Sequence, residues 1–176
     1  MRNIIVRYGL ISGGLLSVMM ATTVPFIDKI GFDNGAILGY TTMVLAFLLV
    51  YFGVRAYRDA NGGVITFGRA FRVGITITAI ASACYVATWQ VVYYKFLPDF
   101  GDKYAAHMID KARTDGGTDA EIATITADMA RFNEMYKNPL VNIAFTFLEP
   151  SPVGLIMTLV AAGLLRRQSS QPQMPA

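Results

Sequence analysis

The stretch VGITITAIASACYVATWQVVYY, residues 73–94, carries no charged side chain over its whole length. A helix of that length rises about 33 Å, which matches the roughly 30 Å hydrocarbon layer of a bilayer. Three other stretches are similarly apolar, at about residues 4–26, 36–54 and 140–165. Of the 176 residues, 54% are hydrophobic and only 15% are charged, whereas soluble domains are about 25% charged. We therefore predict an all-α membrane protein with four transmembrane helices.

The positions of Lys and Arg predict the orientation of these spans, because both residues gather on the cytoplasmic side of membrane proteins. The N-terminus, the loop between the second and third spans and the C-terminal end are basic, with Asp59 as their only acid. We therefore predict that both termini are cytoplasmic. Four arginines of the loop are expected to contact lipid headgroups, with a specific lipid or partner site as the alternative: Arg55, Arg58, Arg69 and Arg72.

Residues 98–138 are the soluble-looking section and are predicted to form an extracytoplasmic αα-hairpin between the third and fourth spans. Thr118 and Glu121 form a capping box, with a hydroxyl at the helix cap and a carboxylate three positions on. An apolar stripe at helical spacing follows: Ile122, Ile125, Met129, Phe132 and Tyr136. The stripe is expected to pack against the other helix of the hairpin, or to dock a partner or a second copy. His107, the single histidine, has no ligand set around it and is expected to be a solvated helix residue.

The segment FTFLEPSPVGLIMTL, residues 145–159, interrupts the fourth span with Glu149, Pro150 and Pro152. The prolines cannot donate backbone hydrogen bonds, so the span is expected to bend there. Glu149 lies about 25 Å along a helix from Arg166, which places it near the outer interface. Three interpretations stay open: the carboxylate faces water or caps a backbone amide, it is buried and paired, or it lines an ion or substrate path. The partners considered for a buried carboxylate are Gln90, Tyr93 and Lys95.

Three motifs resemble one family of bacterial membrane proteins. They are YGLISGGL near the start, GGVITFGRAFRVG after the second span and EPSPVGLIMTLVAAGLLRR near the end. Together they resemble the family catalogued as domain of unknown function 4199, over about residues 4–167. The resemblance implies a small four-span protein of the bacterial cytoplasmic (inner) membrane, and it carries over no catalytic residue and no substrate. We expect a single membrane domain over residues 1–167, followed by a disordered polar tail, residues 168–176.

The sequence contains no nucleophile with a nearby base, no HExxH motif and no phosphate-binding loop. No enzyme activity, cofactor or metal site is therefore predicted. Nucleic acid is not an expected partner, because the basic residues lie beside lipid headgroups. The first hypothesis is a non-enzymatic accessory or interaction subunit of a membrane assembly, in contact with lipids and with a membrane-protein partner or further copies of itself. The alternative is a small oligomeric transporter or channel that uses Glu149 at the proline-broken helix.

Overall fold

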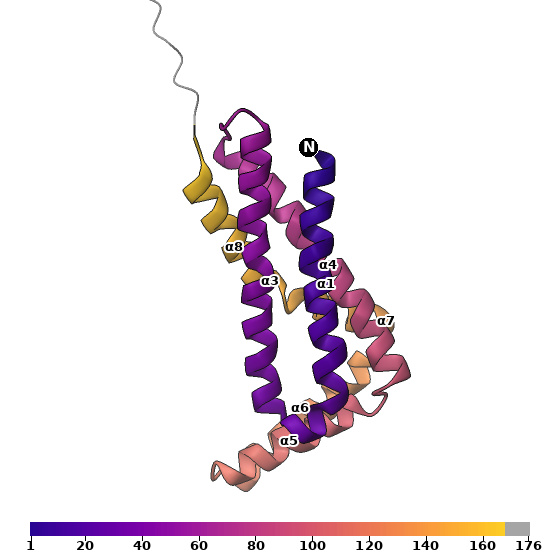
Figure 1. Ribbon diagram of the computed structural model, residues 1–176. Coiled ribbons are helices and arrows are strands. Elements are labelled where there is room, and N and C mark those ends of the chain that lie inside the picture. The colour runs from indigo at the N-terminus through magenta and orange to yellow at the C-terminus, as the bar shows by residue number, and fades with distance from the viewer. Residues whose placement is uncertain (168–176) are drawn as a thin grey trace, which may run out of the picture.

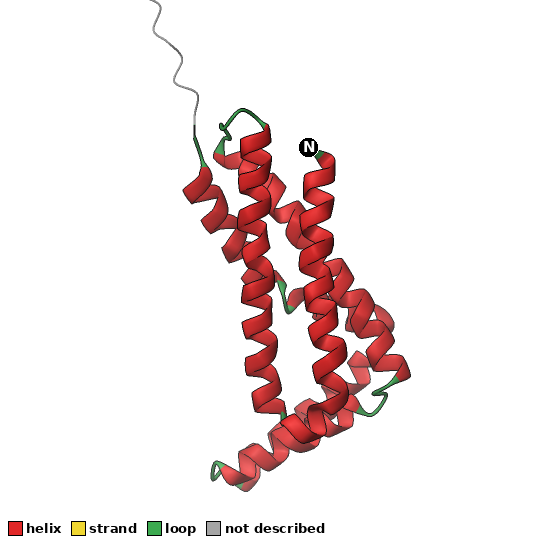
Figure 2. Ribbon diagram, viewed as in Figure 1, coloured by secondary structure: helices red, strands yellow, loops and turns green. Residues whose placement is uncertain are grey.

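The computed structural model describes residues 1–167 and is helical almost throughout (Figure 1, Figure 2). The predicted disordered tail, residues 168–176, lies outside the described residues. Within residues 1–167 the extended pairing is limited to an isolated antiparallel bridge between Ile65 and Arg167. In chain order the elements are α1 (Arg2–Thr23), the 3-10 turn η1 (Val24–Phe26), α2 (Ile27–Ile30), α3 (Phe32–Ala60), α4 (Phe67–Lys95), α5 (Phe100–Thr114), α6 (Asp119–Tyr136), α7 (Pro139–Leu148) and α8 (Ser151–Leu165).

Four segments are long and apolar enough to cross a membrane: Arg2–Ile30, Phe32–Ala60, Phe67–Lys95 and Pro139–Leu165. The predictions of an all-helical chain and of four candidate spans are therefore confirmed. The helices run longer than the apolar stretches that predict them. Both α3 and α4 have 29 residues, about 43 Å of helix, so their ends extend beyond a hydrocarbon layer of roughly 30 Å.

Local sequence explains where these helices begin and end. Pro25 lies in η1, and α1 ends before it because proline cannot donate to the preceding turn. Gly31, at φ +84°, separates α2 from α3. The Thr66 hydroxyl caps α4 by accepting a hydrogen bond from the backbone N–H of Arg69 at 3.4 Å, as its position predicts. These breaks set the lengths of the first three spans.

The central helix of the bundle is α4, which packs against α1, α3, α7 and α8. α1 approaches α4 closely, since a Cβ added at Gly13 would lie 2.7 Å from the Cβ atom of Cys84. Small residues at such crossings let helices associate where the hydrophobic effect gives no driving force. The four spans therefore form one bundle in which α4 contacts every other span.

The two ends of the bundle differ in chemistry. Figure 1 shows the N-terminus, the loop between α3 and α4 and the last described residues at one end, here called the arginine end. The α5–α6 hairpin crosses the opposite end, called the hairpin end, where α1 stops and α3 starts. At the start of α6 the capping box is confirmed: the Glu121 backbone N–H donates to the Thr118 hydroxyl, and the Thr118 N–H donates to the Glu121 carboxylate.

Candidate functional site

The fourth span is broken where the sequence places Glu149 and its two prolines. α7 ends one residue before Glu149, and α8 begins directly after Pro150. Pro152 lies in the first turn of α8, where its missing N–H costs no helical hydrogen bond. The Ser151 hydroxyl donates to the carbonyl of Phe147, and so partners a backbone group near the break. The expected interruption of this span therefore falls at Glu149 and Pro150.

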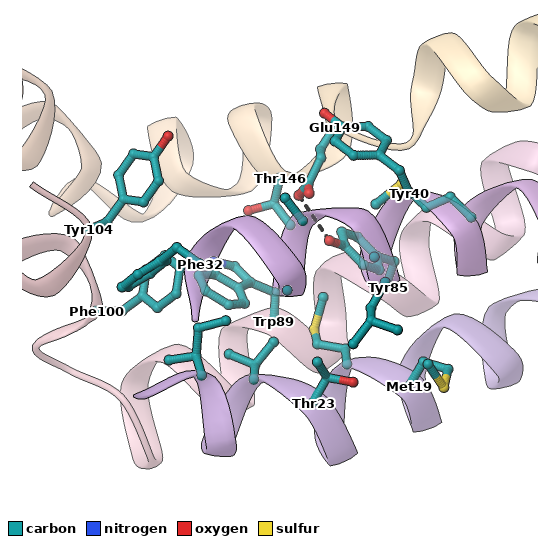
Figure 3. A pocket seen from close by; sticks show the side chains of 18 of the residues that line it. Met19, Thr23, Phe32, Tyr40, Tyr85, Trp89, Phe100, Tyr104, Thr146 and Glu149 are labelled. Atoms are coloured by element: carbon teal, nitrogen blue, oxygen red, sulfur yellow. Dashed lines mark hydrogen bonds between the residues drawn. The ribbon is translucent and has the colours of Figure 1, made fainter. Parts of the chain in front are cut away.

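Glu149 reaches from this junction to α4. Its Oε2 atom accepts a hydrogen bond from the Tyr85 hydroxyl at 2.9 Å (Figure 3). Tyr85 precedes Lys95, the last residue of α4, by about 15 Å of helix, so the carboxylate lies well inside the bundle. Its position relative to a membrane interface stays a prediction. α7 occupies the part of the fourth segment nearest the hairpin end, and it carries Glu149 into the bundle.

The partners expected for a buried Glu149 were wrong. Among the hydrogen bonds of residues 1–167, none joins Glu149 to Gln90, Tyr93 or Lys95. The Gln90 side-chain amide instead donates to Oδ1 of Asn142 on α7 at 2.7 Å. The break turns Glu149 toward Tyr85, which lies more than one helical turn before Gln90 on α4. Sequence reasoning missed Tyr85 because a tyrosine in an apolar span reads as a packing residue until its neighbour is known.

Tyr85 belongs to a polar face of α4 that points into the bundle. Thr78, Ser82, Tyr85 and Trp89 recur at spacings of four, three and four residues, and each is at most 9% exposed. The Thr78 hydroxyl lies 3.2 Å from that of Thr158 on α8. Ser82 Oγ and Trp89 Nε1 are buried without a hydrogen-bond partner. Buried polar atoms usually have partners, so this face keeps capacity to bind a further polar group.

Trp89 Nε1 lies near the hydroxyl of Tyr136 without reaching hydrogen-bond geometry. Burial raises the pKa of the Tyr136 hydroxyl, so that hydroxyl stays protonated. The Tyr136 oxygen lies 3.3 Å from the Thr146 hydroxyl on α7. The Trp89 N–H and the hydroxyls of Tyr136 and Thr146 therefore lie close together at the hairpin end of the bundle.

These groups border a cavity of about 450 Å³ between the broken span and the hairpin (Figure 3). Side chains of α1, α3, α4, α5, α6 and α7 line it. Glu149 is the one charged residue in that lining, and it borders the open space. The aromatic lining residues are Phe32, Tyr40, Tyr85, Trp89, Phe100, Tyr104, Phe132, Tyr136 and Phe145. The cavity is thus aromatic, with one carboxylate and several hydroxyls.

A layer of apolar side chains closes the bundle between the cavity and the arginine end. Phe47, Val50 and Val54 on α3 and Ile77 on α4 are all 0% exposed. Gly154 of α8 packs directly on Phe47, since an added Cβ would lie 3.2 Å from its Cζ atom. The described chain therefore holds a cavity that ends inside the bundle.

The hairpin is attached over the cavity by aromatic contacts from the first residue of α3. The Phe32 ring meets those of Phe100 and Tyr104 edge to face at 5.7 and 5.6 Å, and it stacks on the His107 ring at 5.0 Å. His107 lies on α5, as expected, but its side chain is only partly solvated: it is half-buried against Phe32, and its Nε2 atom lies 3.5 Å from an Asp33 carboxylate oxygen. Nothing in the spacing around His107 indicates that a residue so far along the chain packs on it.

Two ion pairs reinforce this attachment. Lys103 Nζ lies 2.8 Å from Asp28 Oδ2, and Lys111 Nζ lies 3.0 Å from Asp33 Oδ1. Hydrogen bonding to Asp28 raises the pKa of Lys103, and hydrogen bonding to Asp33 raises that of Lys111. Both lysines therefore stay charged and tie α5 to the α2–α3 junction, although exposed pairs of this kind are individually weak.

The apolar stripe of α6 faces the chain's own helices. All five of its residues are half-buried: Ile122, Ile125, Met129, Phe132 and Tyr136. Phe132 meets the ring of Phe145 on α7 at 5.4 Å, and Tyr136 meets Tyr93 on α4 at 5.6 Å. The two hairpin helices pack on each other, as expected, but these ring contacts of the stripe reach α7 and α4 and not α5. A docking face made from the same residues stays a prediction, and a partner would have to compete with these contacts.

The four loop arginines lie at the arginine end, far from the cavity: Arg55, Arg58, Arg69 and Arg72. Arg58 lies 2.7 Å and Arg55 3.8 Å from carboxylate oxygens of Asp59. The Arg69 guanidinium lies 5.7 Å from the centre of the Tyr57 ring. Contact with lipid headgroups stays a prediction for all four.

Residues 1–167 contain no cluster of three or more His, Cys, Asp or Glu side chains that could hold a metal ion. The features that stand out at the hairpin end are the cavity, the Glu149–Tyr85 pair and the unpartnered Trp89 N–H. Together they can hold an apolar molecule that carries a polar or charged group.

The family model described as "Protein of unknown function (DUF4199)" matches residues 7–167. This match confirms the resemblance seen in the three sequence motifs and includes every residue that lines the cavity. No curated protein and no solved structure matches the chain.

Proposed function

The chain belongs to the family of proteins of unknown function DUF4199, and we propose that it binds a small amphipathic molecule in the cavity at Glu149. The observation that carries this proposal is the lining itself, which is aromatic and aliphatic around a single carboxylate. Ligand sites in proteins typically combine an apolar wall with a few polar groups that fix orientation. A volume of about 450 Å³ suits a drug-sized molecule or part of a lipid.

We place this binding protein in the bacterial inner membrane, with both termini in the cytoplasm and the hairpin on the outside. The gathering of arginines at one end supports that orientation, because Lys and Arg favour the cytoplasmic side. The N-terminus and the last described residues lie at that same end (Figure 1). The cavity would then open in the outer half of the membrane.

The proposed role is non-enzymatic. The protein would act as an accessory subunit that holds its ligand for a membrane assembly, with the Glu149 carboxylate and the Tyr85 hydroxyl as binding groups. Lipids and a membrane-protein partner are the proposed neighbours, and no cofactor is invoked.

Transport is a second candidate, favoured by the break in α7 and α8 at an acidic residue. The buried layer at Phe47, Val50 and Ile77 opposes a path through a single chain, so transport requires several copies or a rearrangement. Flux of a probe into proteoliposomes that depends on Glu149, and is lost in Glu149→Gln, would support this candidate. Equal flux in both proteins, or none, would remove it.

The binding proposal can be tested with Trp89, the single tryptophan of the chain, which lines the cavity. The probe is 12-bromododecan-1-ol, a neutral amphipathic alcohol whose bromine quenches tryptophan fluorescence on contact. Protein in lipid nanodiscs should show a saturable quenching of Trp89 above the background from probe dissolved in lipid.

Gly39→Phe should abolish the saturable part, because Gly39 lines the cavity and an added Cβ meets no atom within 4 Å. Gly163→Phe is the matched control, since Gly163 is exposed on α8 and is equally free of neighbours. Quenching that never saturates, or that Gly39→Phe leaves unchanged, would contradict the proposal.

A further inference from the structure

The only charged residue in the cavity wall is acidic. Among its lining residues Glu149 is the only acid, and there is no lysine, arginine or histidine. The Tyr85 hydroxyl engages Oε2 of Glu149, whereas no hydrogen bond within residues 1–167 involves Oε1. A carboxylate in an apolar setting is stabilised by a partner of opposite charge, and an anionic ligand at the same place is repelled.

The walls around this carboxylate are aromatic. Figure 3 shows the side chains of Tyr40 and Tyr85 beside Glu149, with Trp89 further along α4. The faces of aromatic rings carry negative electrostatic potential and attract organic cations, most strongly at tryptophan. A carboxylate among aromatic rings therefore offers two kinds of attraction to the same positive group.

A metal ion fits this wall poorly. Hard cations such as Ca²⁺ take six or more oxygen ligands, and the lining offers one carboxylate, with hydroxyl groups spread over several helices. Trp89 is 7% exposed, and its N–H has no partner. That group is a donor, so it cannot be a metal ligand but can donate to an oxygen of an organic ligand.

The remaining walls suit apolar groups of varied shape. Met19, Met20 and Met43 line the side formed by α1 and α3. Methionine side chains are unbranched and polarisable, and they adapt to irregular partners. The wall therefore favours a cation with bulky apolar groups over a small hydrated ammonium ion.

From these observations we propose that the molecule held in the cavity is a lipophilic organic cation, whose positive centre lies at Glu149 among Tyr40, Tyr85 and Trp89. This inference rests on the proposed binding function and adds the chemical class of the ligand. It concerns only the charge of the ligand, so the inference can fail while the proposed binding function stands.

The test uses three probes of similar bulk that differ in charge: tetraphenylphosphonium, tetraphenylborate and neutral triphenylphosphine oxide. Their affinities for the full chain in nanodiscs are measured by equilibrium dialysis, with the change in Trp89 fluorescence as the readout of location. We expect the phosphonium to bind at least tenfold more tightly than the borate, after subtraction of binding to empty nanodiscs. Glu149→Gln should weaken phosphonium binding at least tenfold without weakening binding of the phosphine oxide, and the retained phosphine oxide binding also shows that the variant is folded.

Borate or phosphine oxide bound as tightly as phosphonium would overturn the inference and leave the binding proposal standing. So would phosphonium affinity that Glu149→Gln does not change. If no probe binds above the empty nanodisc, or if Gly39→Phe binds all three as the wild type does, the inference falls together with the proposed function.

Discussion

Replacement of Gly154 by alanine tests the packing that closes the cavity from the arginine end. An alanine Cβ would fall on Cγ2 of Thr78 and 3.2 and 3.3 Å from two ring atoms of Phe47. Thr78 is 4% exposed and Phe47 0%, so neither side chain has free space into which to move. Overpacking of this kind typically costs about 1–3 kcal/mol in the free energy of unfolding.

Alanine also favours a helix over glycine by roughly 1 kcal/mol, which would mask part of that cost. Gly163→Ala on the same helix carries the same propensity change, and its Cβ would meet no atom within 4 Å. The difference between the two variants therefore isolates the packing term. The unfolding temperature of Gly154→Ala should be lower than that of Gly163→Ala, by about 2–4 °C for each kcal/mol of packing cost, as for soluble proteins of this size.

The assay can use Cys84, the single cysteine of the chain, which is half-buried where α1 crosses α4. A thiol-reactive dye that fluoresces on labelling reports the temperature at which this crossing opens in purified protein. A Gly154→Ala variant as stable as Gly163→Ala would refute the close approach of α8 to α3 and α4, and with it the closed layer beneath the cavity.

Two other predictions concern the hairpin. Phe32→Ala removes three ring contacts, each worth about 0.5–1.5 kcal/mol, so hydrogen–deuterium exchange in α5 should accelerate. Phe52→Ala, which removes an exposed ring, is the control. Equal exchange in both variants would contradict the docking of the hairpin on Phe32. High salt should accelerate the same exchange, because it screens the Lys103–Asp28 and Lys111–Asp33 pairs. Hydrogen bonding from the Thr118 backbone N–H lowers the pKa of Glu121. The cap therefore stabilises α6 fully at pH values above the ordinary pKa of a glutamate, and this stabilisation is lost as the pH falls through the lowered pKa. The NMR signal of the Thr118 amide should follow that titration, and a midpoint in the ordinary range would contradict the cap.

Much of the fold could be predicted from the sequence because its causes are local. The charge-free run at residues 73–94 indicates a span by length and composition alone. The Thr66 cap, the Thr118–Glu121 capping box and the break at Pro150 depend on residues within a few positions of one another. Local hydrogen bonds and steric limits are sufficient to place such features.

The contacts of the site could not be predicted, because they join residues far apart in the chain. Glu149 was recognisable as an unusual residue, but its bond to Tyr85 depends on the direction in which α7 leaves the break. The docking of Phe32 on His107 likewise depends on how the hairpin folds back over α3. Hydropathy describes which residues enter a membrane and contains no information on which helices become neighbours, so the cavity appears only in three dimensions.

The measurement that tests the binding function most directly is native mass spectrometry of the protein extracted gently from its own membrane. The wild type and Gly163→Phe should retain a bound small molecule, and Gly39→Phe, which fills the cavity, should be found without it. The same bound mass in all three proteins, or a wild type that carries nothing, would contradict a ligand site beneath the hairpin.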